Sequence, residues 1–414
     1  MLGQILRPHS ANLAHSCCEK SLIFPFHDHL RFVANVRRGL RPRFTKLGST
    51  GSESPTAVKV TQNKSATPKF DMESKMRFLR EDLTHLFDDQ GIDASAYEAV
   101  VDFRDPITRY SSLSGYLFNI AFLRRAFDPR FVLHDMRPAE DEPYGITTRW
   151  TMSMRFTPAA ALPTQKYWNP TITFTGTSTY VFNPASGKIF RHIDTWDSIT
   201  NQDFFSVEGF LDFFKQLLSF YTTPNLETPE YVVLRRGRDY EVRQYEPYVV
   251  AETTMEAAGA LNRDVLMAGA VSVNPAGPGN KAFNTLARYI FGDNRTAARM
   301  AMTTPVFSDT TGTMRFVIGP SAVKALPRLP APNSPAVSLG REEGGVFAAR
   351  VFGGYAGEEE ASRQAEVLRA SLERDGLKPA SSVWTLARYN DPSTPAPFRR
   401  NEVLLPLKDF DMWL

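Results

Sequence analysis

After a long polar stretch, the first half of the chain places apolar residues three or four positions apart, a pattern that predicts amphipathic helices. Residues 73–87 follow this spacing, and residues 116–127 follow it up to Asp128 and Pro129, which end the helix. Runs rich in β-branched and aromatic residues then predict four strands, at residues 131–137, 144–156, 171–182 and 188–197. An apolar helix over residues 207–221 closes this unit. Helices followed by a long, curved antiparallel sheet predict an α+β cone around a pocket.

A second unit follows a short linker at residues 224–230 that contains two prolines. Its strand-like runs lie at residues 231–255 (two strands), 313–319, 344–355, 382–390 and 400–407, and an amphipathic helix is predicted at 358–376. Residues 281–291 predict a further helix, because five apolar residues share one face: Phe283, Leu286, Ala287, Ile290 and Phe291. Gly292 is the residue expected just beyond its C-terminus. Residues 320–339 hold five prolines and predict a loop.

The polar stretch itself, residues 1–70, has 11 Lys and Arg residues against 3 Asp and Glu residues, and is rich in Ser and Thr. This composition is typical of organelle transit peptides. Abundant hydroxyl groups and the lack of a clean amphipathic helix at the N-terminus favour a plastid, and hence a chloroplast location, over a mitochondrion. The alternative is a disordered tail without a targeting role.

The remaining sequence carries 37 basic and 42 acidic residues, a net charge of about −5, although the whole chain has a net charge of +3. Such a body is a poor candidate for general nucleic-acid binding, which needs a basic surface. It also lacks a run of the ~18–20 apolar residues that a spanning helix requires. We therefore predict at most a peripheral association with membranes or lipid globules. Both cysteines, Cys17 and Cys18, lie in the tail, so the body has no disulfide and no Cys nucleophile.

Three histidines lie outside the tail, at positions 85, 134 and 192, and none follows Asp194. His134 and His192 lie in predicted strands beside Asp135 and Asp194. A His–Asp pair in a cone-shaped pocket can serve acid–base catalysis. The competing interpretation, which we favour, places these histidines on the outer face of the sheet.

Five short sequences occur in order within the predicted elements of the second unit: YEVRQY (240–245), YIFGDN (289–294), MTTPV (302–306), FGGY (352–355) and RRNEV (399–403). Together they resemble the motifs of the SOUL/haem-binding-protein family over about residues 228–412. The first unit, with the sequence DFRDPITRYSSLSGY, resembles the NTF2-like fold, in particular a small uncharacterised plant and cyanobacterial domain of that type. This combination resembles the two-domain chloroplast haem-binding-like proteins.

The resemblance implies four segments: a transit peptide or disordered tail over residues 1–70, an NTF2-like domain over 71–223, a linker over 224–230 and a SOUL domain over 231–414. The implied fold class is α+β throughout. The first domain is expected to be a cone of helices and a curved antiparallel sheet. The second is expected to be a distorted β-barrel with two flanking helices.

The resemblance implies that the first helix of the SOUL domain forms one wall of a shallow apolar groove, which accepts a tetrapyrrole. Phe283 and Ala287 would face the macrocycle, and Arg288 would lie near its propionates. The full predicted binding set is Phe283, Leu286, Ala287, Arg288, Phe291 and Arg399. These residue types suit such a ligand, because a planar dicarboxylate needs an apolar slot with a cation at its rim.

Two positions where the family can carry a basic residue fall at Asn280 and near Pro395 in this chain, and Arg399 is the candidate that compensates. With no His or Cys in the second unit, a protein ligand to haem iron would have to be Met or Tyr, or rarely Lys. We expect weak or absent ligation and no dedicated metal site. Met302 could ligate iron, but packing at the entry of a strand is the favoured interpretation.

These observations predict a non-enzymatic carrier or buffer for haem or a related tetrapyrrole in plastid metabolism. Its expected partners are the tetrapyrrole and a haem-degrading or tetrapyrrole-pathway enzyme, with homodimerisation through the first domain. One alternative is an enzyme that acts on a small apolar substrate in the NTF2-like pocket. Another is a structural plastid lipid-globule or eyespot protein that does not bind haem.

Overall fold

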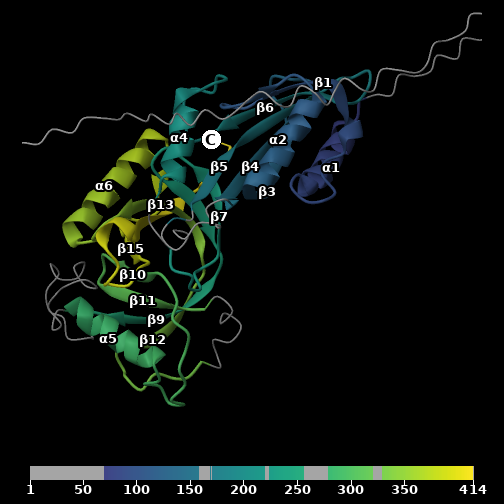
Figure 1. Cartoon of the computed structure of the whole chain (residues 1–414). Coiled ribbons are helices and arrows are strands. Elements are labelled where there is room, and N and C mark those ends of the chain that lie inside the picture. The colour runs from purple at the N-terminus through teal and green to yellow at the C-terminus, as the bar shows by residue number, and fades with distance from the viewer. Residues whose placement is uncertain are drawn as a thin grey trace, which may run out of the picture. The chain divides into compact units, whose positions relative to one another are not determined.

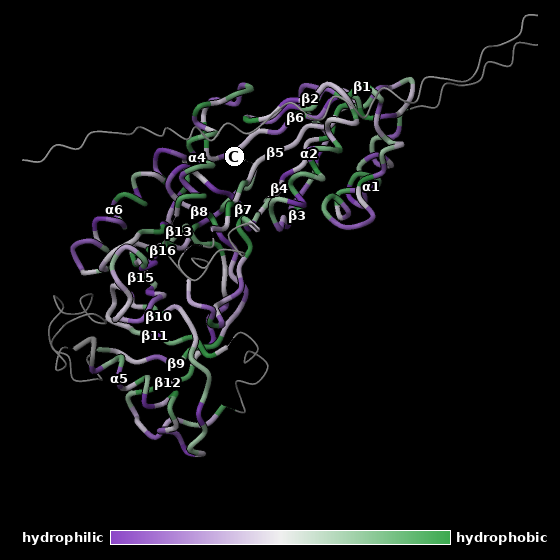
Figure 2. Tube along the Cα trace, viewed as in Figure 1, coloured by the Kyte–Doolittle hydropathy of each residue, from purple (hydrophilic) through white to green (hydrophobic). Residues whose placement is uncertain are grey.

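The structure is a computed structural model that describes residues 70–157, 168, 170–219, 223–255, 278–319 and 329–413. The predicted transit peptide therefore lies outside the described residues, as does the first part of the proline-rich loop. Asn280 belongs to a described helix, but its side chain is outside the described part. No helix among the described residues is long and apolar enough to span a bilayer, and Figure 2 shows hydrophobic and hydrophilic positions interleaved along the helices and strands.

The first half contains the predicted helices and strands with two additional strands (Figure 1). Its main elements are α1 (Met72–Asp82), β1 (Tyr97–Arg104), β2 (Arg109–Tyr110), α2 (Leu113–Ala126), β3 (Phe127–Pro138), β4 (Gly145–Phe156), β5 (Thr171–Phe182), β6 (Ile189–Trp196) and α4 (Val207–Leu217). Helix α2 begins three residues earlier than predicted, because the Ser112 side chain caps it by accepting a hydrogen bond from Gly115 N. The helix ends before Pro129, as predicted, and the proline lies inside strand β3. Because β3 is an edge strand, the missing N–H group of the proline can face away from the neighbouring strand.

These strands form one six-stranded sheet in the order β2-β1-β6-β5-β4-β3. All pairs are antiparallel except β1 with β6, which is parallel. Apolar residues of α1, α2 and the inner face of the sheet share one core, which includes Leu79, Tyr116, Ile146 and Phe182. The α+β prediction is confirmed for this half.

The second half is built on a longer sheet (Figure 1). Its elements are β7 (Tyr231–Arg236), β8 (Glu241–Tyr245), β9 (Tyr248–Thr254), α5 (Pro278–Ile290), β10 (Val306–Asp309), β11 (Thr313–Ile318), β12 (Ser338–Glu342), β13 (Gly345–Gly353), α6 (Glu358–Arg374), β14 (Lys378–Pro379), β15 (Thr385–Arg388) and β16 (Arg400–Lys408). The strand order is β12-β9-β11-β10-β15-β16-β13-β8-β7, and β14 pairs with β16 outside this path. Because β12 and β7 end the order unpaired with each other, the described strands form a curled half-barrel.

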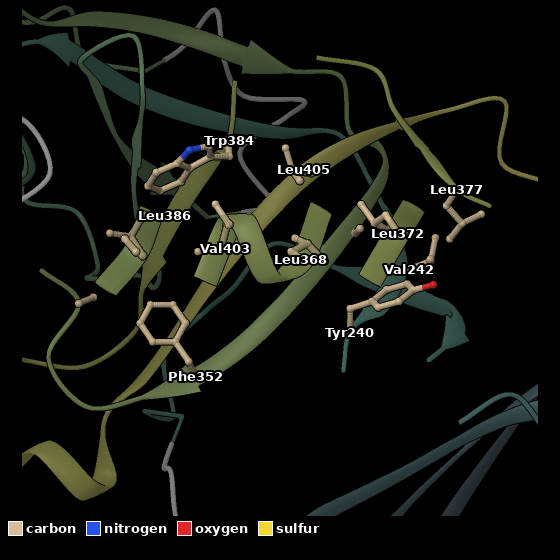
Figure 3. Close-up of a cluster of buried hydrophobic side chains, with 14 residues drawn as sticks. Tyr240, Val242, Phe352, Leu368, Leu372, Leu377, Trp384, Leu386, Val403 and Leu405 are labelled. Carbon is tan, nitrogen blue, oxygen red and sulfur yellow. The ribbon is translucent and has the colours of Figure 1, made fainter. Parts of the chain in front are cut away.

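Two helices cover this sheet at different places, as predicted. Leu368 and Leu372 of α6 lie against Val242, Val403 and Leu405 of the sheet (Figure 3). Helix α5 packs separately on β9 and β11 and contributes Ala282, Leu286 and Tyr289 to a second core. In the strand order, β10 and β15 lie between the strands that contact α5 and those that contact α6.

Strand β7 joins the two halves, because it pairs with β8 and also contacts β4 and β5 of the first sheet. Arg236 of β7 donates two hydrogen bonds, of 2.7 and 2.9 Å, to the Asp212 carboxylate of α4, and its backbone N donates to Thr175 Oγ1 at 2.7 Å. Thr151 Oγ1 donates to the carbonyl of Val233 at 2.6 Å. The Arg236–Asp212 ion pair is about nine-tenths buried, so a buried polar contact joins the two halves.

Candidate functional site

A small cavity of about 40 Å³ opens between α5 and the part of the second sheet formed by β10, β15 and β16. Phe283 contributes the α5 wall, and Val306 of β10 contributes part of the floor. The remaining lining residues come from β15, β16 and the loop between them: Arg388, Asn390, Pro392, Arg399 and Asn401. One wall is therefore aromatic and the opposite wall is polar and cationic.

A second cavity, of about 10 Å³, continues along the same helix. It is lined by Ile290, Ala301, Met302, Thr303, Pro305, Val306 and Phe316. Val306 belongs to both cavities, and the ring of Phe316 contacts the ring of Phe283 with 5.0 Å between centroids. The two cavities are thus adjoining parts of one groove along α5, which we call the α5 groove.

The turn after α5 explains why the sequence YIFGDN precedes MTTPV. Gly292 adopts a φ of +112°, which strongly favours glycine. The Asn294 amide donates to the carbonyls of Tyr289 and Ala298, and its oxygen accepts from Ala298 N at 3.0 Å. Met300 N then donates to the carbonyl of Ile290 at 2.9 Å. These bonds fold the chain back on α5 and bring Met302 to the end of the groove.

The structure distributes the predicted α5 residues over three environments. Phe283 is half-buried and lines the groove, and Ala287 lies one turn further along and is half-buried against the same core. Leu286 is 0% exposed and points into the core beneath α5, so it supports the helix and cannot reach a ligand in this conformation. Arg288 and Phe291 are exposed, and the guanidinium of Arg288 lies 3.4 Å from the carboxylate of Asp293.

Arg399 is separated from α5 in sequence but lines the same cavity as Phe283. Its side chain is held rigidly, because it donates to the carbonyls of Thr394 and Pro392 and lies over the ring of Tyr355, 4.4 Å from the centroid. Pro395 precedes a short 3₁₀ turn in the same loop. Arg399 thus belongs to the same loop as Pro395, and its compensation for the missing basic residue there stays a prediction.

Arg388 is the charged residue of the cavity lining that was not predicted from the sequence. It is 6% exposed and donates to Ser308 Oγ and to the carbonyl of Ala356. Burial lowers its pKa to about 10. A signal was available, since an arginine follows the apolar residues Leu386 and Ala387 at the end of a buried strand.

The residue types of the α5 groove suit a tetrapyrrole, because the α5 side is apolar and two arginines lie at one end. Cavities of 10 to 40 Å³ are far smaller than the several hundred Å³ of an enclosed ligand pocket. A macrocycle would therefore lie across the open groove. Among the described residues no group of three or more His, Cys, Asp or Glu side chains is placed to hold a metal ion. Met302, 40% exposed at the groove, is the residue with a metal-ligating side chain that lines it.

The two histidines of the first sheet have separate environments. The outer-face expectation is wrong for His192, which is 4% exposed, stacks on Tyr180 at 4.0 Å and has its two ring nitrogens near Tyr116 Oη and Asp194. His134 does lie on the outer face, where Nε2 lies 2.8 Å from Thr151 Oγ1 and burial lowers its pKa. The two histidines therefore lie on opposite faces and do not form one site.

Two regions of the chain match known protein families. Residues 226–406 match the SOUL heme-binding protein family, and residues 73–192 match an uncharacterized conserved protein family, DUF2358. The chain therefore carries a C-terminal SOUL haem-binding domain behind a distinct N-terminal region, as the motifs predicted. No curated protein matches the sequence.

Several solved structures are similar to part of the chain. An NTF2-like protein of unknown function from Exiguobacterium sp. 255-15 is 16% identical over 32% of this chain and 96% of that chain, with a TM-score of 0.22. An LEH-like epoxide hydrolase of M. tuberculosis is 13% identical over 36% and 92% of the two chains, with a TM-score of 0.26. A protein of unknown function with a cystatin-like fold from Methylobium petroleophilum PM1 is 9% identical over 32% and 82%, with a TM-score of 0.25.

Proposed function

We propose that the C-terminal half binds haem or a related tetrapyrrole reversibly in the α5 groove and acts as a carrier or buffer, without catalysing a reaction. The observation that carries the proposal is the groove itself: an apolar helix wall that faces buried arginines, within a domain that matches a haem-binding family. Haem would supply a planar apolar surface and two carboxylates. Phe283 and Ala287 would pack on its face, and the arginines would meet its charged edge.

The expected affinity follows from the area that such a ligand covers. Several hundred Å² of apolar surface at ~25 cal/mol/Å² amounts to roughly 8 to 12 kcal/mol before the costs of association. Association costs of about 4 kcal/mol or more reduce this to about 8 kcal/mol or less, which corresponds to micromolar affinity at best. No iron ligand is needed for this result, and a metal-free porphyrin should bind comparably.

A plastid setting is part of the proposal and is supported by the composition of residues 1–70. Fusion of these residues to a fluorescent protein in plant cells should direct it to chloroplasts. Delivery to mitochondria or retention in the cytosol would refute the plastid role and leave the binding proposal standing. Transfer of the ligand to a tetrapyrrole-pathway enzyme, and dimerisation through the N-terminal half, are further parts of the proposal.

The binding proposal is tested by titrating haemin and protoporphyrin IX into the full chain, with the Soret band and tryptophan fluorescence as readouts. Phe283→Asp should weaken binding about 100-fold or more, because it places a carboxylate on the apolar wall. Phe118→Asp is the matched control, since Phe118 is 64% exposed on α2 in the first half. Saturable binding that both variants retain equally would overturn the assignment to the α5 groove.

A further inference from the structure

Helix α4 is apolar on two sides. One side packs on the first sheet, where Phe213 and Leu217 lie against the core that includes Phe174 and Trp196. The other side carries four large apolar side chains that are between 49% and 70% exposed: Val207, Leu211, Phe214 and Leu218. An exposed apolar side of this kind marks an interaction surface.

The spacing of these four residues is that of two helices packed side by side. They follow one another at intervals of four, three and four residues. This alternation keeps apolar side chains in one line along the contact between paired helices. Phe204 continues it three residues before Val207, in the turn that precedes the helix. The pattern therefore predicts a second helix as the occupant of this side of α4.

The turn before α4 adds two exposed aromatic rings to the same surface, those of Phe204 and Phe205. The ring of Phe205 contacts the rings of Phe204 and Phe210, with 5.9 and 5.0 Å between centroids. Phe205 has a φ of +67°, in the left-handed region that a bulky residue rarely adopts. Such strain is retained where the position of a side chain matters, and here it holds an aromatic ring at the surface.

The extent of this surface is that of a protein interface. Taking roughly 150–250 Å² for a large side chain that is fully exposed, the six residues leave about 600 Å² of apolar area open to solvent. The largest apolar patch on a typical monomer is about 300–600 Å², and a stable dimer buries about 800 Å² on each partner. With a polar rim added, the surface reaches that size. We call it the α4 face, formed by Phe204, Phe205, Val207, Leu211, Phe214 and Leu218.

The charges of α4 favour a protein over a lipid surface. The helix exposes one acidic and one basic side chain, Glu208 and Lys215, since Asp212 is buried against Arg236. Helices that lie on membranes are rich in Lys and Arg on their polar side. In an antiparallel pair of α4 helices, the end with Glu208 lies beside the end of the other helix with Lys215, so opposite charges meet.

Another surface of the first half is already occupied within the chain. The side of β4 and β5 that carries Thr151 and Thr175 is contacted by β7, through hydrogen bonds to the carbonyl of Val233 and from the backbone N of Arg236. A second copy therefore cannot add its own sheet there. The α4 face lies away from these bonds and stays open.

We propose that the α4 face is the contact between two copies of this chain, in which the two α4 helices pack antiparallel about a two-fold axis. A two-fold contact needs a self-complementary surface, and the apolar line with opposite charges at its two ends provides one. The inference rests on the proposed dimerisation of the N-terminal half and gives it a surface. It does not depend on tetrapyrrole binding, because the α5 groove belongs to the other half.

The test measures the mass of the full chain by analytical ultracentrifugation over a range of concentrations. Wild-type protein should sediment as a reversible dimer. Leu211→Asp should raise the dissociation constant about 100-fold or more, because a two-fold contact buries the new carboxylate twice without a partner. Phe122→Asp puts the same charge at an exposed phenylalanine of α2 and is the matched control, which should keep the wild-type dissociation constant.

The outcomes separate this inference from tetrapyrrole binding. A wild-type monomer would overturn it, and flotation of that monomer with phosphatidylcholine vesicles would reassign the α4 face to a lipid surface. A dimer that persists in Leu211→Asp, or that Phe122→Asp dissociates instead, would place the contact elsewhere and also overturn it. If Leu211→Asp does not fold, Leu218→Asp tests the same face. Protoporphyrin IX should bind Leu211→Asp as it binds wild type, and a dimer that binds no porphyrin would refute the binding proposal alone.

Discussion

Replacing Glu402 by Gln should destabilise the second half strongly, because Glu402 is the buried centre of the RRNEV motif. Its carboxylate is 0% exposed, accepts 2.8 and 3.0 Å hydrogen bonds from Arg243, and accepts further bonds from Arg400 and from Tyr389 Oη. Glu402→Gln keeps the shape but leaves two arginine side chains, one of them 1% exposed, without their shared counter-ion. Breaking a buried pair in this way costs about 3–5 kcal/mol.

The assay is urea unfolding of the full chain followed by tryptophan fluorescence, with Trp384 in the adjacent core as a reporter. The matched control is Glu360→Gln on α6, whose ion pair with Arg363 is more exposed and should cost at most about 1 kcal/mol. A loss below about 1 kcal/mol for Glu402→Gln would refute the conclusion that this motif is held together by a buried ion cluster.

The same cluster predicts a pH dependence. Burial by itself raises the pKa of Glu402, but the charges of Arg243 and Arg400 outweigh burial and hold it well below its usual value. Because the pKa is depressed in the folded state, the stabilisation is fully present above about pH 4.3, the usual value for Glu. It is lost only as the pH falls through the folded-state pKa. The difference in unfolding free energy between wild type and Glu402→Gln should therefore be constant from pH 7 to 5 and shrink in stronger acid.

Two further predictions concern the junction and the turn. Asp212→Asn should lower the unfolding free energy by about 3 kcal/mol, because it leaves the guanidinium of Arg236 buried without its partner; Asp203→Asn, on an exposed loop residue, is the control, and equal urea midpoints would contradict the prediction. Gly292→Ala should cost about 1–2 kcal/mol because φ is +112° there, and should weaken porphyrin binding because the turn positions Met302; a variant with unchanged thermal midpoint and affinity would count against that role.

Helical periodicity and motif order were sufficient to predict both α+β halves and their main helices. They missed β1, whose partner β6 lies more than 80 residues away in a parallel pairing that local pattern does not reveal. They also placed Leu286 with Phe283, since both lie on one helical face. That face is divided between core and groove, and only the packing of α5 on β9 and β11 shows where the division falls.

The polar end of the groove was only half predictable. Arg399 was identified from its motif, whereas Arg388 needed the pairing of β15 with β10 and β16 before its position beside Phe283 could be seen. His192 was misplaced for a related reason. The residue pattern of β6 predicts a strand correctly, but it does not show which face of the strand is buried. That depends on the helices that cover the sheet.

The central claim is that a tetrapyrrole binds in the α5 groove, and hydrogen–deuterium exchange of the full chain with and without protoporphyrin IX tests it most directly. The account predicts slower exchange on ligand binding in α5, in residues 300–306 and in the loop at 390–399, with the strands of the first sheet unchanged. Saturable binding accompanied by protection only in the first sheet, or by none in α5, would contradict it.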